Sequence, residues 1–142
     1  MALFPKKVKY RKWQTGRTNP NKKRVESRGV SLGFGSFGLK AQTHGRIRSN
    51  QIEAARKTIA RQMQKKGKLW IRIFPDRPFT TKPAEVGMGK GKGDLQGYEA
   101  EVLPGRIIFE LDGLSEEVSR EALRKAGAKL PVKTKIVSRA GN

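Results

Sequence analysis

The chain has 142 residues, of which 35% are hydrophobic, so it is long enough for one domain and is not composed like a disordered segment. It holds no cysteine and a single histidine, His44, which excludes disulfides, thiolate metal sites and metal sites built from several histidines. No apolar run approaches the roughly 20 residues that a membrane-spanning helix requires. The cation-rich start of the chain lacks the Ser richness and amphipathic pattern of a transit peptide, so we expect a cytoplasmic protein.

Charge is the feature that points to a partner. Lys and Arg total 32 against 12 Asp and Glu, which gives a formal net charge of +20. Residues 1–72 carry 20 of these cations and only two acids, whereas residues 73–142 carry 12 cations and 10 acids. Such a charge destabilises a compact state unless a polyanion neutralises it. The first half of the chain is therefore expected to meet a polyanion, either nucleic acid or an anionic membrane.

Residues 1–28 are predicted to form an extended basic arm. Pro5, Gly16 and Pro20 interrupt any helix, and apolar residues are too sparse to order the segment by themselves. Trp13 lies among the cations, where an aromatic ring can stack on an unpaired base, which weighs against an inert solvated tail. We expect the arm to fold on a partner, with residues 29–142 forming a single α/β RNA-binding domain.

Glycine-rich residues 29–47 predict short or bulged strands, and a helix is expected after them. Ser49 or Asn50 can serve as its N-cap, and Glu53 stands three residues after Asn50, as in a capping box. Gly67 stands where a left-handed terminator belongs. The expected apolar stripe is Ile52, Ala55, Ile59 and Met63, and opposite it the cations Lys57, Arg61 and Lys65 recur every four residues.

The middle of the chain predicts strands around a loop. Alternation over residues 68–74 is typical of a strand, and a Gly- and Lys-rich loop is expected over residues 80–97. Residues 98–103 and 106–111 are predicted to pair with each other, because Pro104-Gly105 between them is a tight-hairpin signal.

The last third predicts a second helix and a final strand at residues 132–138. Ser115 is the expected N-cap, with Glu116 and Glu117 in the first turn, where the helix dipole favours acids. The order of elements predicts an α+β fold or a two-layer α/β sandwich, with two helices and a mixed or antiparallel sheet. The expected apolar stripe of the second helix is Val118, Ala122, Ala126 and Leu130.

Residues 33–38 (GFGSFG) match G-x-G-x-x-G, the pattern of dinucleotide sites and of kinase glycine loops. A dinucleotide site requires a helix that begins at the last glycine, whereas the expected helix begins about ten residues later. A kinase loop requires a catalytic loop and an Asp-Phe-Gly, and the chain has neither. We interpret the match as a coincidence within a glycine-rich strand.

Residues 87–93 (GMGKGKG) do not form a P-loop, because Lys92 stands where the second glycine belongs. In an extended segment Lys90 and Lys92 project to the same side about 7 Å apart, and glycines let the backbone approach a surface. The segment is therefore either a finger that contacts phosphates or a mobile loop with two solvated lysines. The global charge favours the finger.

No catalytic group can be assembled from the sequence with a chemical reason. His44 has no neighbouring acid to orient it, and no nucleophile–base pair can be proposed. Single carboxylates such as Asp76 and Glu85 are explained as surface solubility. We expect no enzyme, no cofactor, no metal and no small-molecule substrate.

Several short stretches, in order along nearly the whole chain, resemble a known family. They are FGSFGLKA (34–41), QIEAAR (51–56), WIRIFPD (70–76), Lys82-Pro83, MGKGKG (88–93), Pro104-Gly105, FELDG (109–113), Glu121-Ala122 and AKLPVK (128–133). Each is weak alone, but the ordered set resembles the bacterial-type large-subunit ribosomal protein L-sixteen family, grouped with L-ten-e.

The resemblance implies an α/β fold with a hammerhead-like β element. It implies a structural constituent of the large ribosomal subunit, without catalysis of its own, that binds large-subunit rRNA beside the tRNA cleft and contacts tRNA and neighbouring ribosomal proteins. Gly87 stands where family members often carry a cation, and residues 19–28 look longer than usual, so contacts of these positions are not carried over. The residues that would face tRNA are Gly89, Lys90, Gly91, Lys92 and Gly93.

The residues themselves predict phosphate neutralisation and shape recognition of RNA. An architectural DNA-binding protein is one rival, and it would prefer duplex DNA and usually show dimer symmetry. A small nucleotide-using enzyme built on residues 33–38 is another. A membrane surface is disfavoured because the cationic helix has no Trp or Phe anchor. The expected rRNA contacts are Lys6, Lys9, Arg11, Lys12, Arg17, Arg46, Arg48, Lys57, Arg61, Lys65 and Arg72.

Overall fold

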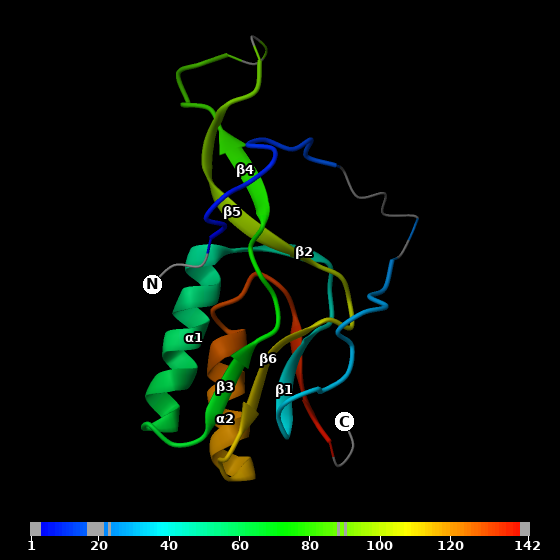
Figure 1. The fold of residues 1–142 in the computed structure, drawn as a ribbon, viewed down its shortest axis with the longest axis vertical. Coiled ribbons are helices and arrows are strands. Elements are labelled where there is room, and N and C mark those ends of the chain that lie inside the picture. Colours follow the sequence, from blue (N-terminus) through cyan, green and yellow to red (C-terminus); the bar gives the residue numbers. More distant parts are fainter. Residues whose placement is uncertain (1–3, 17–21, 23, 88, 90, 140–142) are drawn as a thin grey trace.

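The computed structural model describes residues 4–16, 22, 24–87, 89 and 91–139. Two of the predicted contact residues, Arg17 and Lys90, lie outside the described residues. The described part of the chain contains two helices and seven strands, arranged as a helical layer, a larger sheet and a smaller sheet (Figure 1). None of its helices is long and apolar enough to cross a membrane.

The larger sheet has four strands in the order β3-β6-β1-β7, each antiparallel to its neighbours. Its central row pairs Leu39 with Phe109 on one side and Ile71 with Phe109 on the other, so that apolar side chains share one face. Strand β6 is buried at all but its last residue, as expected of a strand covered on both faces. The strands are β1 (Phe37–Ala41), β3 (Lys68–Ile71), β6 (Ile107–Asp112) and β7 (Thr134–Ser138).

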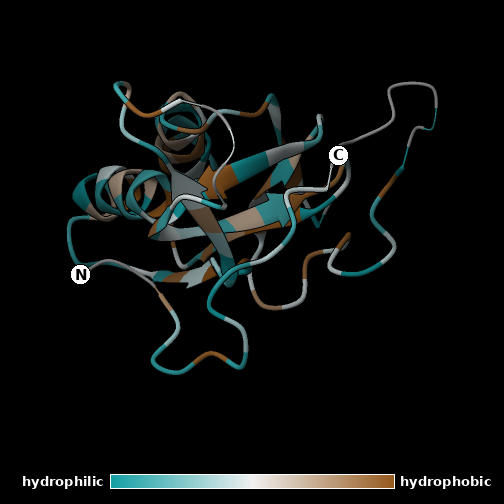
Figure 2. Cartoon of the chain, turned by 90° about the horizontal axis from the view of Figure 1, so that it is seen from above, coloured by the Kyte–Doolittle hydropathy of each residue, from teal (hydrophilic) through white to brown (hydrophobic). Residues whose placement is uncertain are grey.

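Two helices, α1 (Ser49–Met63) and α2 (Glu116–Gly127), pack against each other and close the core (Figure 2). Helix α2 contacts β1 and β7, whereas α1 contacts α2 and the strands β2 and β5 of the smaller sheet. Ile52, Ala55 and Ile59 of α1 are fully buried in the same cluster as Leu39 and Phe109. Helix α1 therefore joins the two sheets through one apolar core.

The smaller sheet, in the order β2-β5-β4, is also antiparallel. Strands β4 and β5 form a hairpin that leaves the body of the molecule, and residues 82–93 connect its strands at the far end (Figure 1). The strands are β2 (Gly45–Arg48), β4 (Arg77–Thr81) and β5 (Asp94–Val102).

Residues 26–36, which precede β1, cover the face of the larger sheet that the helices leave open. Ile107 N donates to Gly29 O at 2.8 Å, and Ser36 N donates to Leu111 O at 2.9 Å. Leu32 lies so close over Gly38 of β1 that any side chain at Gly38 would collide with it. This covering segment explains why β6 is buried on both faces.

The α+β class and the two helices are confirmed, and the mixed or antiparallel sheet is resolved into two antiparallel sheets. The hairpin predicted at Pro104-Gly105 is wrong. Leu103 and Arg106 do form a turn, with a hydrogen bond of 3.2 Å, but β5 and β6 on either side belong to different sheets. A turn signal fixes the local reversal of the chain and not the partner of each strand.

Other boundaries also differ from the sequence expectations. The N-cap of α1 is Arg48, whose backbone N–H donates to Gln51 Oε1 at 2.9 Å, and not Ser49 or Asn50. The helix ends at Met63, and Gln64 and Lys65 adopt the left-handed conformation before Gly67 does. The Gly- and Lys-rich loop is shorter than the predicted 80–97, because strands β4 and β5 extend to Thr81 and from Asp94.

Two end elements need smaller corrections. Ser115 is the N-cap of α2 as predicted, and its side chain accepts a hydrogen bond from Val118 N at 3.3 Å. Val118 is exposed, however, and Ser119 takes its place on the buried face. The last strand begins at Thr134 and not at residue 132, and the strand expected over residues 68–74 ends at Ile71.

Candidate nucleic-acid interface

The outer face of α1 carries exposed cations that have no acid to pair with among the described residues. Lys57 and Arg61 lie opposite the buried stripe, and Lys65 follows directly after the helix. The only acid of α1, Glu53, is buried and forms an ion pair with Arg56. Hydrogen bonds from the Arg56 guanidinium hold the pKa of the Glu53 carboxyl at about 2. The charge of Lys57, Arg61 and Lys65 is thus left for an external anion.

Helix α2 provides the contrast, because its cations are neutralised locally. Arg120 pairs with Glu116 at 3.0 Å, and Arg124 and Lys125 both pair with Glu121, at 2.7 and 3.6 Å. The hydrogen bond from Arg124 lowers the pKa of the Glu121 carboxyl below its ordinary value. Two helices of similar length therefore present different surfaces to solvent, one cationic and one nearly balanced.

The loop between β4 and β5 presents its glycines and Lys92 to solvent. Gly89 and Gly91 adopt φ angles of 95° and 92°, which side chains rarely tolerate, although a Cβ placed at either position would meet no atom within 4 Å. The ammonium of Lys82 donates a hydrogen bond to Gly89 O. Gly93 is different, because a side chain there would collide with the backbone of Thr81. The base of the loop is therefore tightly closed, and its tip is open.

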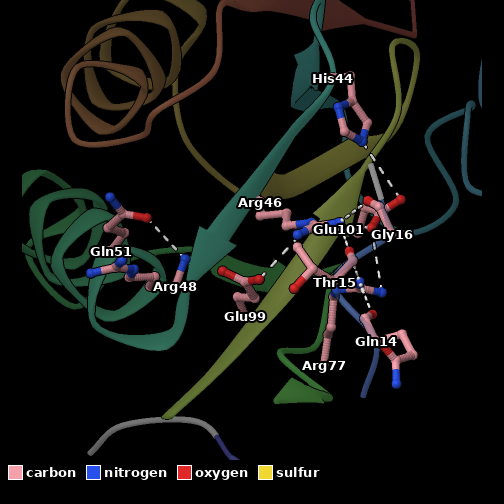
Figure 3. A network of polar contacts seen from close by, with 10 residues as sticks. All are labelled: Gln14, Thr15, Gly16, His44, Arg46, Arg48, Gln51, Arg77, Glu99 and Glu101. Atoms are coloured by element: carbon pink, nitrogen blue, oxygen red, sulfur yellow. Dashed lines mark hydrogen bonds and ion pairs between the residues drawn. The ribbon is translucent and has the colours of Figure 1, made fainter. Parts of the chain in front are cut away.

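Two arginines of the smaller sheet hold the arm against the hairpin (Figure 3). Arg46 Nη2 donates to Gly16 O at 2.8 Å, and Arg77 Nη2 donates to Gln14 O at 2.9 Å. The Arg77 guanidinium also lies over the Trp13 ring, 5.5 Å from its centroid. The arm segment 13–16 thus contacts the smaller sheet, although it contains no helix or strand.

Glu101 of β5 balances the charge of these arginines. Its carboxylate lies 3.4 Å from Arg46 Nε, 3.7 Å from Arg77 Nη1 and 3.6 Å from His44 Nε2. Glu99 lies next to it along β5, 4.0 Å from Arg46 Nε. The arginine donors therefore point at this chain's own carboxylates and carbonyls (Figure 3).

The glycine motif at residues 33–38 binds an anion, but the anion is the side chain of Glu110. The backbone N–H groups of Gly33, Phe34 and Gly35 all donate to Glu110 Oε1, at 3.0, 2.9 and 2.9 Å. Arg72 Nη1 forms an ion pair with the other carboxylate oxygen. Although burial raises the pKa of the Glu110 carboxyl, these hydrogen bonds outweigh it and the pKa is lowered overall. No room remains for a pyrophosphate in this nest of N–H groups.

The predicted contact residues fall into two groups, those whose charged group is engaged within the chain and those that are exposed. Arg46 and Arg72 have guanidinium groups engaged inside the chain, and Arg48 lies over the Phe79 ring at 4.6 Å while staying exposed. The exposed group is Lys6, Lys9, Arg11, Lys12, Arg48, Lys57, Arg61, Lys65 and Lys92. The arm residues are brought near the hairpin, whereas Lys57, Arg61 and Lys65 form a separate surface on α1.

Comparisons with known proteins identify the family of the chain. Residues 5–137 match the family described as ribosomal protein L16p/L10e. A large ribosomal subunit protein uL16 of Halorhodospira halophila is 55% identical over 137 residues, which cover 96% of this chain and 97% of that protein. The proteins of the same name from Caulobacter vibrioides and Paracidovorax citrulli are 54% and 53% identical over the same length, which covers 93% and 96% of those proteins. The chain belongs to this family.

Membership in the L16p/L10e family confirms the resemblance of the sequence motifs and decides the class of function. The chain is a structural constituent of the large ribosomal subunit and not an enzyme. The rival interpretation of residues 33–38 as a nucleotide site is wrong for a physical reason as well, since Glu110 fills the nest. Among the described residues no three acids or histidines lie close enough to hold a metal.

Two residues that matter for the surface escaped the sequence analysis. Arg77 was missed because it follows Asp76 and precedes Pro78, a context that predicts a turn and not a strand. Glu110 was missed because it lies in an otherwise apolar strand, where an acid is usually explained as solvent-facing. A carboxylate at the centre of an apolar run was the one available signal, because a buried charge requires partners.

Proposed function

We propose that the chain binds large-subunit rRNA through the outer face of α1 and the exposed cations of the arm, within cytoplasmic ribosomes. The observation that carries this proposal is the contrast between the two helices. Lys57, Arg61 and Lys65 have no acidic partner among the described residues, whereas the cations of α2 do. Exposed cations held on a rigid helix neutralise phosphates without first having to release an internal partner.

The arm extends this surface. Lys6, Lys9, Arg11 and Lys12 are exposed, and residues 13–16 behind them are anchored to the smaller sheet by Arg46 and Arg77. We assign Arg46 and Arg72 a supporting role beneath the surface, since their donors are occupied. The predicted contact of Arg17 belongs to the same arm and lies outside the described residues.

The loop of residues 82–93 is proposed to contact tRNA. It lies at the end of the β4–β5 hairpin, far from α1, so the chain can hold rRNA at one side and reach another RNA at the other (Figure 1). The open glycines Gly89 and Gly91 allow close approach of a backbone, and Lys92 supplies charge. We take the smaller sheet with this hairpin as the hammerhead-like element that the family resemblance implies.

Charge removal on α1 tests the rRNA proposal. In a Lys57→Ala, Arg61→Ala double variant we expect weaker binding to protein-free large-subunit rRNA. Each lost phosphate contact should reduce the slope of log affinity against log salt by about 0.7–0.9. A filter-binding titration at several salt concentrations measures both quantities.

The matched control removes two cations from α2, in an Arg124→Ala, Lys125→Ala variant. Because both cations pair with Glu121, this variant should bind rRNA as the parent does. Equal losses in the two variants would show that only net charge matters and would refute a defined α1 surface. Stronger binding to duplex DNA than to rRNA would instead favour the architectural DNA-binding alternative.

A further inference from the structure

We propose that Phe34, stacked on Trp70, is a platform on which one unpaired RNA base stacks. This inference rests on the proposed binding of rRNA, but it concerns a surface that none of the predicted contact residues except Arg72 touches. The platform consists of Phe34 in the glycine motif and Trp70 in β3.

The rings of Phe34 and Trp70 stack on each other. Their centroids lie 5.8 Å apart and their planes are inclined by 19°. The guanidinium of Arg72 lies over the Phe34 ring as well, 5.2 Å from its centroid. Aromatic rings and arginine planes arranged in this way are the groups on which unpaired bases stack.

Phe34 is exposed to solvent although an apolar core lies nearby. The residue is 57% exposed, although the larger sheet contributes to an apolar core. Its backbone is held by Glu110, which accepts hydrogen bonds from the N–H groups of Phe34 and of the glycines on both sides of it. A fully buried carboxylate therefore fixes the motif in a conformation that leaves the ring in solvent. Packing alone gives no reason for this arrangement.

The charged groups around the platform favour a ligand with negatively charged phosphates and flat bases. Lys68 shares the outer face of β3 with Trp70, because side chains alternate along a strand, and Arg72 follows directly after the strand. Arg139 contacts the motif from the other side, and its Nε donates to Gly35 O at 2.7 Å. Of the two nearby acids, Glu110 is buried in its nest and Asp112 accepts hydrogen bonds from Ser36 and Gly113. Nucleic acid with an unpaired base matches this combination better than an apolar protein segment does.

The test uses the full chain with Trp13→Phe, which leaves Trp70 as the only tryptophan. We expect a short single-stranded oligoadenylate to quench Trp70 fluorescence, and the same strand paired with oligouridylate to leave it unchanged, because a duplex offers no free base face. In this background, Phe34→Ala and Phe34→Leu should abolish the quenching and weaken binding to protein-free large-subunit rRNA about tenfold. The leucine variant keeps apolar packing without an aromatic face, and thermal melts establish that each variant is folded.

Phe74→Ala is the matched control. Phe74 is 50% exposed, close to the exposure of Phe34, but no ring lies stacked on it in the described part of the chain. This variant should retain both rRNA affinity and quenching.

Three outcomes overturn the inference, and they separate it from the proposed function. Full rRNA affinity of both Phe34 variants, with unaltered salt dependence, would remove the base platform and leave the α1 surface standing. Unchanged RNA affinity together with a Trp70 that becomes shielded from acrylamide only in assembled subunits would assign the platform to a protein neighbour. Failure of the parent chain to bind rRNA at all would overturn the proposed function and the platform with it.

Discussion

At the scale of single residues, Glu110 decides what the glycine motif does. Three successive N–H groups that could bind a phosphate donate to its carboxylate instead, and Arg72 forms an ion pair with the same carboxylate. A buried charge of this kind is stable only while all its partners remain. The same carboxylate ties the segment that precedes β1 to the outer face of the larger sheet, so one side chain closes the motif to ligands and fixes the cover of β6.

Replacing Glu110 should therefore be costly. We expect Glu110→Ala to lower the free energy of unfolding by about 3–5 kcal/mol, because Arg72 and three N–H groups lose their partner in a buried site. Urea denaturation of the purified chain measures this change. Glu116→Ala removes an exposed acid and should change the free energy little. A small effect at Glu110 would mean that the covering segment does not depend on the nest.

Glu53 makes stability depend on pH. Its pKa is about 2 in the folded chain, below the ordinary 4.5, so folding favours the charged form. The stabilisation is complete above about pH 5 and is lost as the pH falls toward 2. In Glu53→Gln we expect lower stability at neutral pH and a shallower loss between about pH 5 and pH 2. Denaturation midpoints along that pH range test this, with Glu117→Gln as a control on the exposed side of α2. Equal slopes in all three proteins would exclude Glu53 as the source.

At the scale of elements, similar sequences build different surfaces. Both helices are amphipathic and rich in cations, but α2 carries acids three or four residues from its cations and α1 carries only Glu53. Such spacing forms ion pairs along one face of a helix. The β4–β5 hairpin differs from both helices, because it has little core of its own and extends a glycine-rich loop away from the body (Figure 1).

The hairpin loop is expected to contribute to tRNA binding and not to the stability of the folded chain. In a Lys90→Ala, Lys92→Ala variant we expect near-normal assembly and an unchanged melting temperature, with weaker tRNA binding or slower translation by ribosomes that contain it. Ribosome-based peptide synthesis and tRNA filter binding measure these effects. Translation at the parent rate would refute the tRNA-facing role. Loss of the chain from the subunit would mean that the loop contributes to assembly.

At the scale of the whole molecule, the charge is divided among three surfaces. The arm is anchored beside the hairpin, α1 presents its own cations, and α2 is nearly neutral. A net charge of +20 on a small domain repels itself, and a polyanion relieves that repulsion. This division of charge supports the proposal that the arm and α1 bind RNA.

Because salt weakens phosphate contacts, retention of the chain at high salt requires the folded surface to add shape-based contacts to charge neutralisation. We expect a tagged copy to sediment with the large subunit and with whole ribosomes, and to stay there after a high-salt wash, because many contacts act together with the folded surface. The α1 double variant should be released at lower salt than the parent. A copy that stays at the top of the gradient, or follows chromosomal DNA, would contradict the ribosomal assignment.

The amino-acid sequence alone was enough to predict the class of the fold, the two helices, the buried stripe of α1 and the family. These features follow from local periodicity, capping residues and ordered motifs, which need no knowledge of distant neighbours. The buried residues Ile52, Ala55, Ile59 and Met63 were predictable because a helix repeats every 3.6 residues, wherever it packs.

Which strands pair, and which cations remain exposed without an acidic partner, could not be predicted from local sequence. The turn at Pro104-Gly105 was recognisable, but its strands join different sheets, because pairing depends on partners far along the chain. Glu110 meets Gly33 from 77 residues away, and Arg77 meets Gln14 from 63 residues away. A net charge calculated from the sequence does not distinguish such buried or paired groups from exposed ones. Their availability to RNA is set by contacts that exist only once the chain has folded.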